Sequence, residues 1–259
     1  MISAWAVEAI ARLDDEMEQA GSTPLRAFPL PAGWGVRLWL KDESAQPTDS
    51  LKHRLARALF RQAIAAGQVV EGATVVELFG QVGECPRWVV VGAGTGATSA
   101  AVGRHLRSHD LPGRLAVVDP ENSAYFPGWA SGAADYSTGM PSRIEGIGRP
   151  RMEPGFAPDL VDLVVPVPDA ASVAAARQVR QVTGLAVGGA TGANVWGALE
   201  LITRMRARGI RGDVVTVIGD AGPRHLRTCH DDTWAEDRGL DWRPHAARLE
   251  RLLDGGGLW

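Results

Sequence analysis

Short apolar runs alternate along this chain with segments of helical periodicity. Runs typical of buried or half-buried strands lie at 36–43, 74–78, 88–91, 115–118, 160–167 and 213–220. Helical patterns lie at 1–20, 51–67, 98–108, 170–184, 188–209 and 245–257. Strands that alternate with helices predict an α/β fold with a mostly parallel sheet and helices on both of its faces.

The spacing of two of these strands is unusual. Only nine residues separate the run at 74–78 from the run at 88–91, and they show no helical period. A crossover between neighbouring parallel strands needs about a dozen residues or more, commonly with a helix. The sequence therefore predicts that a crossover segment is missing at this point.

Composition excludes several classes of protein. A net charge of −3 over 259 residues supplies no basic stripe for nucleic acid. No apolar run approaches the roughly 18 residues of a membrane span, and the first twenty residues are too acidic for a signal peptide. The cytoplasm is the expected location. The two cysteines, Cys85 and Cys229, have no ligand spacing, so neither a disulfide framework nor a zinc site is expected.

The basic residues are distributed very unevenly between the two cationic residue types. Of the 27 Lys and Arg residues only Lys41 and Lys52 are lysines. Under a strong bias toward Arg, a lysine should persist where Arg cannot replace it, as in imine chemistry, which needs a neutral primary amine. Survival of two lysines by chance is the alternative explanation.

A glycine-rich turn joins the run at 88–91 to the helix at 98–108. Its backbone amides and the positive end of the helix suit a phosphate or another anion. Read as Gly92-x-Gly94-x-x-Ala97, the turn is close to the dinucleotide fingerprint, with Asp119 placed to hold a ribose hydroxyl. A methyltransferase that binds S-adenosylmethionine and a simple tight turn are also compatible. The motif begins near residue 90, however, rather than at the first strand.

Six segments together resemble the ordered motifs of fold-type II enzymes that depend on pyridoxal 5′-phosphate (PLP). They are LKDESAQPTDSLKHRLA, VVVGAGTGATSA, VVDPENSAYF, SRIEGIGRPRMEP, GGATGANVWGAL and DAGPRHLRT. The chain is most similar to the cysteine synthase and cystathionine β-synthase family, and within it to the actinobacterial L-cysteine desulfhydrase branch. The resemblance covers nearly the whole chain.

The resemblance implies a site and a reaction. Lys52 would form the covalent bond to PLP and would then remove the α-proton of the substrate. Gly94, Thr95, Gly96, Ala97 and Thr98 match the family's GTGGT turn, which holds the cofactor phosphate. The segment 146–148 would line the mouth of the site. In the implied β-elimination, cysteine yields pyruvate, ammonia and sulfide. Family members are generally homodimers that act on small amino acids.

Several positions depart from the family pattern. Ala221 stands where the family has a Ser or Thr hydroxyl that bonds the pyridine nitrogen, so this bond is lost unless Asp220 or a water replaces it. Ala190 replaces one serine of the GxSSGAN loop, while Thr191 keeps a hydroxyl. Ala97 replaces a glycine, which requires a negative φ there.

The largest departure lies after the run at 74–78. There the family has a loop that binds the substrate carboxylate, followed by a mobile subdomain, and this chain has only LFGQVGECPRW. Gln81 offers one amide in place of a turn of backbone donors. We therefore predict a remnant of the N-terminal PLP-lysine domain over 1–86 and a phosphate-binding α/β domain over 87–259, or one merged domain.

Three functions remain open from the sequence. The first is a PLP-dependent lyase that acts on cysteine, or related cysteine synthase chemistry, whose activity the missing loop impairs. The second is a non-catalytic remnant that binds PLP or a partner. A Rossmann-type methyltransferase or reductase is a distant third.

Overall fold

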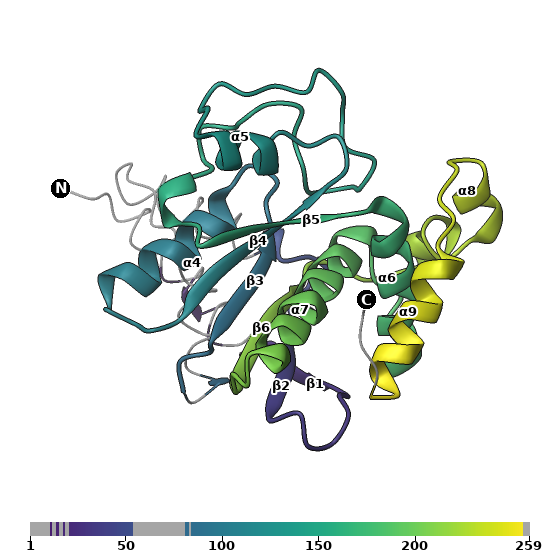
Figure 1. Ribbon diagram of the computed structural model, residues 1–259, viewed down its shortest axis with the longest axis horizontal. Coiled ribbons are helices and arrows are strands. Elements are labelled where there is room, and N and C mark those ends of the chain that lie inside the picture. The colour runs from purple at the N-terminus through teal and green to yellow at the C-terminus, as the bar shows by residue number, and fades with distance from the viewer. Residues whose placement is uncertain are drawn as a thin grey trace.

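A single sheet of six strands forms the centre of the computed structural model (Figure 1). The structure describes residues 21–53, 81–82 and 84–255, together with Ala11, Asp14, Asp15 and Glu18. The strand order is β1-β2-β6-β3-β4-β5, in which β1 is antiparallel to β2 and the other neighbours are parallel. The predicted α/β fold with a mostly parallel sheet is confirmed.

The strands are β1 Leu25–Phe28, β2 Val36–Asp42, β3 Trp88–Gly92, β4 Arg114–Pro120, β5 Leu163–Val167 and β6 Gly212–Ile218. The α-helices are α4 Ala97–Ser108, α5 Tyr125–Ser131, α6 Asp169–Thr183, α7 Gly189–Ala207, α8 Asp232–Glu236 and α9 Arg243–Leu253. Short 3-10 turns are η1 Glu43–Ala45, η2 Pro158–Leu160 and η3 Pro223–Arg227.

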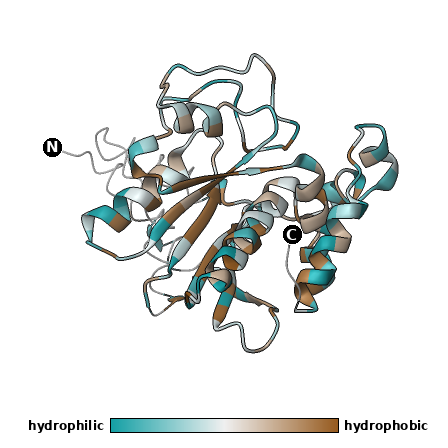
Figure 2. Cartoon of the chain, viewed as in Figure 1, coloured by the Kyte–Doolittle hydropathy of each residue, from teal (hydrophilic) through white to brown (hydrophobic). Residues whose placement is uncertain are grey.

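Continuous β-branched runs explain why the central strands are buried on both faces. The strand β3 reads WVVVG and pairs in parallel with β4 on one side and β6 on the other. Parallel strands covered on both faces need apolar residues at odd and even positions alike, because neither side meets water. Figure 2 shows these strands as brown, hydrophobic ribbons between helices of mixed polarity.

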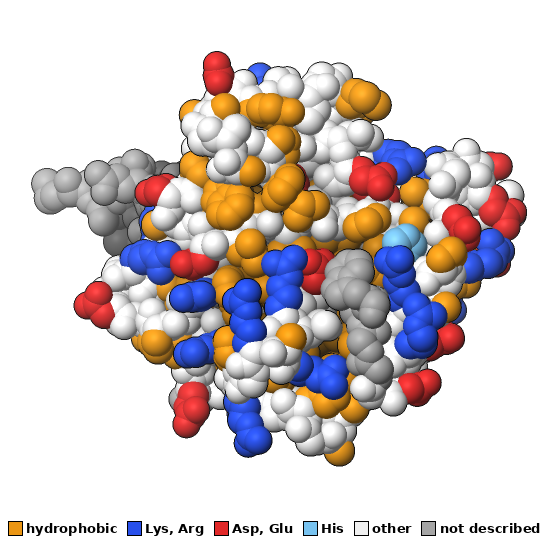
Figure 3. Space-filling view, in the orientation of Figure 1, with side chains coloured by type: hydrophobic (Ala, Val, Ile, Leu, Met, Phe, Trp, Pro, Cys, Tyr) orange, Lys and Arg blue, Asp and Glu red, His pale blue; other side chains and the backbone are white. Residues whose placement is uncertain are grey.

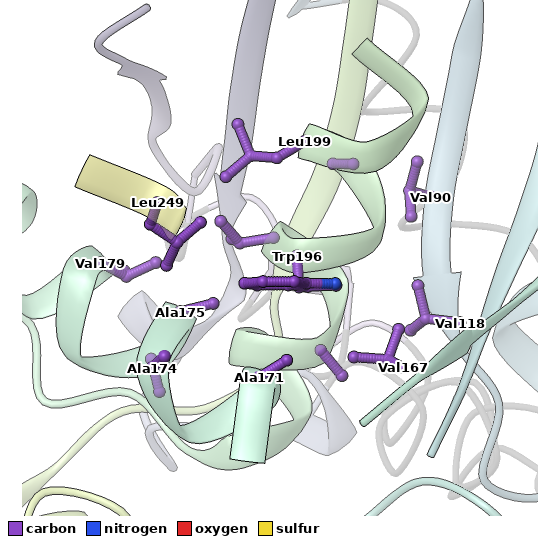
Figure 4. Close-up of a cluster of buried hydrophobic side chains, with 14 of the residues drawn as sticks. Val90, Val118, Val167, Ala171, Ala174, Ala175, Val179, Trp196, Leu199 and Leu249 are labelled. Carbon is purple, nitrogen blue, oxygen red and sulfur yellow. The ribbon is translucent and has the colours of Figure 1, made fainter. Parts of the chain in front are cut away.

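One face of the sheet packs against α6, α7 and α9 around Trp196, which is 1% exposed (Figure 4). Alanines of α6, including Ala171 and Ala175, let that helix approach α7 closely, and Val90 and Val118 reach the same cluster from the sheet. The opposite face packs against α4, with Val89, Val91, Val102, Leu106 and Leu115 among its buried residues. The predicted helices on both faces are therefore confirmed.

Most of the elements predicted within the described part of the chain are present. The predicted strands at 36–43, 88–91, 115–118, 160–167 and 213–220 correspond to β2, β3, β4, β5 and β6, and the last four predicted helices correspond to α4, α6, α7 and α9. The strand β1 was not predicted. The run at 74–78, and most of the predicted helices at 1–20 and 51–67, lie outside the described residues.

Candidate active site

The segments that carry the candidate site follow three neighbouring strands. The strands β2, β6 and β3 lie side by side and run in parallel, so their carboxyl ends meet at one edge of the sheet. Ligand sites of open α/β sheets form in this position, where loops from adjacent strands meet. The Lys52 segment follows β2, the glycine turn follows β3, and Asp220 and Ala221 follow β6.

Backbone contacts fix the Lys52 segment to the end of β6. Ser50 forms a β-bridge with Asp220, and the Leu51 N–H donates to the Gly219 carbonyl at 3.0 Å. Lys52 itself begins a helical turn, in which its N–H lies 3.3 Å from Ser50 Oγ. Its side chain is exposed. The segment that carries Lys52 is thus fixed to the end of β6, the strand next to β3.

The second lysine has a different environment. Lys41 is fully buried, and its ammonium donates to the Thr23 carbonyl at 2.7 Å and to Gln81 Oε1 at 2.8 Å. Glu43 Oε1 lies 3.9 Å from it. The Gln81 amide donates in turn to Ser22 Oγ and the Thr23 carbonyl. These bonds give Lys41 and Gln81 structural partners, and they leave Lys52 as the lysine that solvent reaches.

The glycine turn has the geometry of an anion cradle. Gly96 adopts φ +90° directly before the first residue of α4, a conformation that favours glycine. Within the described chain, no backbone N–H from Gly94 to Thr98 donates to another protein group. Free N–H groups at the start of a long helix point toward a bound anion. An alanine can stand in place of the family's glycine at position 97 if φ is not positive there, and Ala97 does not have a positive φ.

A loop over 146–156 packs so closely against the turn that it leaves no room for a side chain at Gly94 or Gly96. A Cβ atom on Gly94 would lie 2.5 Å from the Gly146 carbonyl oxygen, and one on Gly96 would lie 2.4 Å from the Phe156 nitrogen. The Gly148 N–H also donates to the Ala93 carbonyl at 2.8 Å. The predicted mouth segment 146–148 therefore does lie against the phosphate turn.

Two residues near the turn were missed by the sequence analysis. The Tyr125 hydroxyl donates to the Gly94 carbonyl, and its ring stacks on Phe156 at 4.4 Å between centroids. Burial raises the pKa of Tyr125, so the phenol remains a donor. Arg149 Nη2 would lie 3.4 Å from a Cβ on Gly94. Both residues fall within motifs that carried the resemblance, but only the fold shows that they meet the turn.

Asp119 is buried at the end of β4, where its Oδ2 bonds the start of α5 and its Oδ1 has no hydrogen-bond partner among the described residues. It is 2% exposed, and its Oδ2 accepts a hydrogen bond from the Phe126 N–H at 2.7 Å. Burial raises its pKa to about 6, although hydrogen bonds from Ser123 and from the Phe126 N–H oppose the shift. A ribose hydroxyl cannot reach a carboxylate buried in this way, which disfavours the dinucleotide interpretation.

Asp220 and its neighbours form a charged group beside the end of β6. Arg224 Nη2 donates to Asp220 Oδ2 at 2.6 Å, and His225 Nε2 lies 3.5 Å from the same oxygen. Burial acts to raise the pKa of Asp220, but the contacts with His225 and Arg224 outweigh it and hold that pKa below its ordinary value. Oδ1 is buried without a hydrogen-bond partner. Thr191 Oγ1 accepts from the Gly219 N–H at 3.2 Å.

Comparison with known proteins identifies the family. The pattern of a family described as pyridoxal-phosphate dependent enzyme matches residues 66–220, more than half of the chain. The chain is also 36% identical to L-cysteine desulfhydrase Cds1 of Mycobacterium tuberculosis, an alignment that covers 95% of this chain and 93% of that protein. The chain belongs to the pyridoxal-phosphate-dependent enzymes. PLP is accordingly its cofactor, and the predicted PLP-dependent lyase class is confirmed.

Another relative and a solved structure are consistent with this family assignment. A putative cysteine synthase of Sinorhizobium fredii is 32% identical over 62% of this chain and 46% of that protein. An O-acetylserine-dependent cystathionine β-synthase from Helicobacter pylori has the same fold, with a TM-score of 0.65 over 82% of this chain and 96% of that one, at 18% identity. The desulfhydrase alignment spans 343 positions, more than the 259 residues of this chain, so that relative contains sequence without a counterpart here.

The residues present fit the cofactor that the family implies. The unused N–H groups of the turn and the start of α4 suit a dianionic phosphate, and the Lys52 segment lies at the adjacent strand end. Among the described residues, no group of three or more His, Cys, Asp or Glu side chains is arranged to hold a metal ion. The helices that the structure describes include none that is long and apolar enough to cross a bilayer.

Proposed function

We propose that this protein catalyses β-elimination on cysteine, in which cysteine and water yield pyruvate, ammonia and sulfide. Two parts of the chain that meet at one edge of the sheet support the proposal. One is an exposed lysine whose segment is fixed to the end of β6, and the other is a turn after β3 that suits an anion. The identity with an L-cysteine desulfhydrase over almost the full length of both chains supports this substrate.

Each site residue has a proposed role. The N–H groups of Gly94, Thr95, Gly96, Ala97 and Thr98 hold the cofactor phosphate, with the Thr95 and Thr98 hydroxyls beside them. Lys52 Nζ would hold the cofactor covalently, and as a free amine it would accept the proton from the substrate α-carbon. Bound PLP withdraws electrons from that carbon, which makes its proton removable. The electron pair left at the α-carbon would form the Cα=Cβ double bond as the Cβ–S bond breaks and sulfur leaves as hydrosulfide.

A non-catalytic protein that binds PLP or a partner is the second candidate. Ala221 favours it, because an alanine cannot donate a hydrogen bond to the pyridine nitrogen. The unpartnered Oδ1 of Asp220 is the described group nearest in the chain that could act instead, which would leave the enzyme competent. A cytoplasmic homodimer and the division into 1–86 and 87–259 stay part of the proposal, and light scattering would test the dimer.

Covalent mapping of the cofactor tests the site. We expect purified protein incubated with PLP to show a visible absorption band, and borohydride reduction followed by mass spectrometry to place the label on the Lys52 peptide. With only two lysines in the chain, the Lys41 peptide is an internal control. Lys52→Arg preserves the charge but removes the reactive amine, so it should abolish the band. A label on Lys41, or a band that survives Lys52→Arg, would refute the assignment.

Product measurement separates the two candidates. The lyase should release sulfide and pyruvate from cysteine in equal amounts, and Lys52→Arg should lower this rate by at least about a hundredfold. A wild-type protein that carries the Lys52 label but releases no sulfide would support the non-catalytic candidate instead.

A further inference from the structure

A cavity opens at the opposite end of the sheet from the glycine turn. It has a volume of about 440 Å³ and lies between the first residues of β3, β4 and β5 and the last turns of α7. Ligand pockets commonly span about 300–1,000 Å³. Because the strands run from this end toward the turn, the cavity is separated from the PLP site by the length of the sheet.

The cavity combines an apolar floor with a cationic rim. Its apolar surface includes Trp88, Leu163, Leu201, Met205 and Ile210. Its charged wall contains Arg87, Arg114, Arg204, Arg208 and a single acid, Asp162. Figure 3 shows basic side chains gathered over this end of the molecule. A ligand with an apolar body and anionic groups at its edge would match both the apolar floor and the cationic rim.

Carboxylates in the described part of the chain leave most of the positive charge of the rim unpaired. Among the described residues, no carboxylate forms an ion pair with Arg87, Arg114 or Arg208. Arg204 pairs with Glu200 one turn earlier in α7. Asp162 is engaged elsewhere, since it pairs with Arg107 at 3.2 Å and accepts from the Leu115 N–H at 2.8 Å. The cavity therefore has a net positive charge of about three.

Helix stabilisation explains only part of this cluster. Arg204 and Arg208 lie in or just after the last turn of α7, where cations interact favourably with the helix dipole. Arg87 and Arg114 instead lie just before β3 and at the start of β4, where no helix ends. The Arg114 guanidinium lies 5.7 Å from the Trp88 ring centroid, so a flat cation and a flat aromatic ring already line the same wall.

We propose that this cavity binds a phosphorylated compound with an aromatic ring, the chemistry of a nucleoside phosphate. Guanidinium groups recognise phosphate in a bidentate manner, and three of them are available. Trp88 and its apolar neighbours give a surface on which an aromatic ring stacks. The proposal is independent of the reaction at the PLP site.

Calorimetric titration of the PLP-loaded protein tests the proposal, because the cofactor then occupies the glycine turn. The probes are ADP, inorganic pyrophosphate and adenosine. We expect ADP to bind at one saturable site, pyrophosphate to bind at least tenfold more weakly, and adenosine to show no binding at the same concentrations. Absence of saturable ADP binding would overturn the proposal, as would pyrophosphate binding as tightly as ADP, since only charge would then be recognised.

Matched variants locate the site. Arg87→Ser with Arg114→Ser should weaken ADP binding at least tenfold, and both side chains are exposed, so the fold and the visible cofactor band should remain. Arg180→Ser with Arg251→Ser removes the same charge from the exposed surfaces of α6 and α9 and should change binding less than twofold. Equal losses in the two double variants would show nonspecific attraction and refute the site, as would unchanged binding in the first.

Discussion

At the scale of single residues, the buried carboxyl group of Asp119 should make the free energy of unfolding depend on pH. Its pKa is about 6 in the folded protein against an ordinary value of 3.8, so between these values the folded chain keeps a proton that the unfolded chain has lost. Stability should therefore fall as the pH rises from about 4 to about 6. The shift of about 2 units corresponds to about 3 kcal/mol.

Asp119→Asn should remove this component, because an amide does not titrate in this range. Urea unfolding measured from pH 4 to 7 should show a difference in stability between variant and wild type that changes by about 3 kcal/mol across the interval. Asp237→Asn, at an exposed carboxyl after α8, is the matched control. A difference that stays constant with pH would contradict the prediction.

Sequence motifs suffice to propose those site residues that lie next to one another in the chain. The proposed roles of Lys52 and of the turn from Gly94 to Thr98 rest on motifs of adjacent residues. Tyr125 and Arg149 could not be assigned to the turn, since their contacts with Gly94 depend on how the chain returns after β4. The hydrogen bond between the buried Lys41 and Gln81 likewise depends on long-range packing.

At the scale of elements, the turn between β3 and α4 is packed so tightly that one added methyl group at Gly96 should lower the affinity for the cofactor. Gly96→Ala places a Cβ 2.4 Å from the Phe156 nitrogen and forces a positive φ on alanine, so the turn must move. We expect PLP affinity to fall at least tenfold, measured by titrating the protein freed of cofactor and following the visible band.

The neighbouring position gives the control. Ala97→Gly restores the residue that the family pattern has, at a position whose φ is not positive, and it should change PLP affinity less than threefold. Affinity that is equal in Gly96→Ala and wild type would show that the turn does not hold the phosphate.

Element type was predictable wherever the hydrophobic pattern was long. The strands β3 and β4 and the helices α4, α6 and α7 each present a continuous apolar run or a helical stripe. The strand β1 has four residues between prolines. Among the described strands it pairs with β2 alone, so its extended form depends on that pairing rather than on its own sequence. The five-residue helix α8 and the seven-residue helix α5 are similarly too short for a periodic signal.

At the scale of the whole molecule, the sheet connects distant parts of the chain. The strand β2, early in the sequence, pairs along its full length with β6, and β6 then joins β3. The pattern of apolar runs predicted the class of sheet, but strand order depends on which faces the helices cover in three dimensions. The pairing of β2 with β6 also bears on the proposed division at residues 86 and 87, because a shared sheet favours one cooperative unit.

Leu40→Ala tests this cooperativity. Leu40 is fully buried in β2 and belongs to the core around Trp196, so its truncation should lower the free energy of unfolding by about 2–5 kcal/mol. In urea, ellipticity and tryptophan fluorescence should shift together to a lower midpoint. Leu226→Ala, at an exposed leucine, should leave both curves nearly unchanged. If the two curves moved to different midpoints in Leu40→Ala, the chain would unfold as more than one unit.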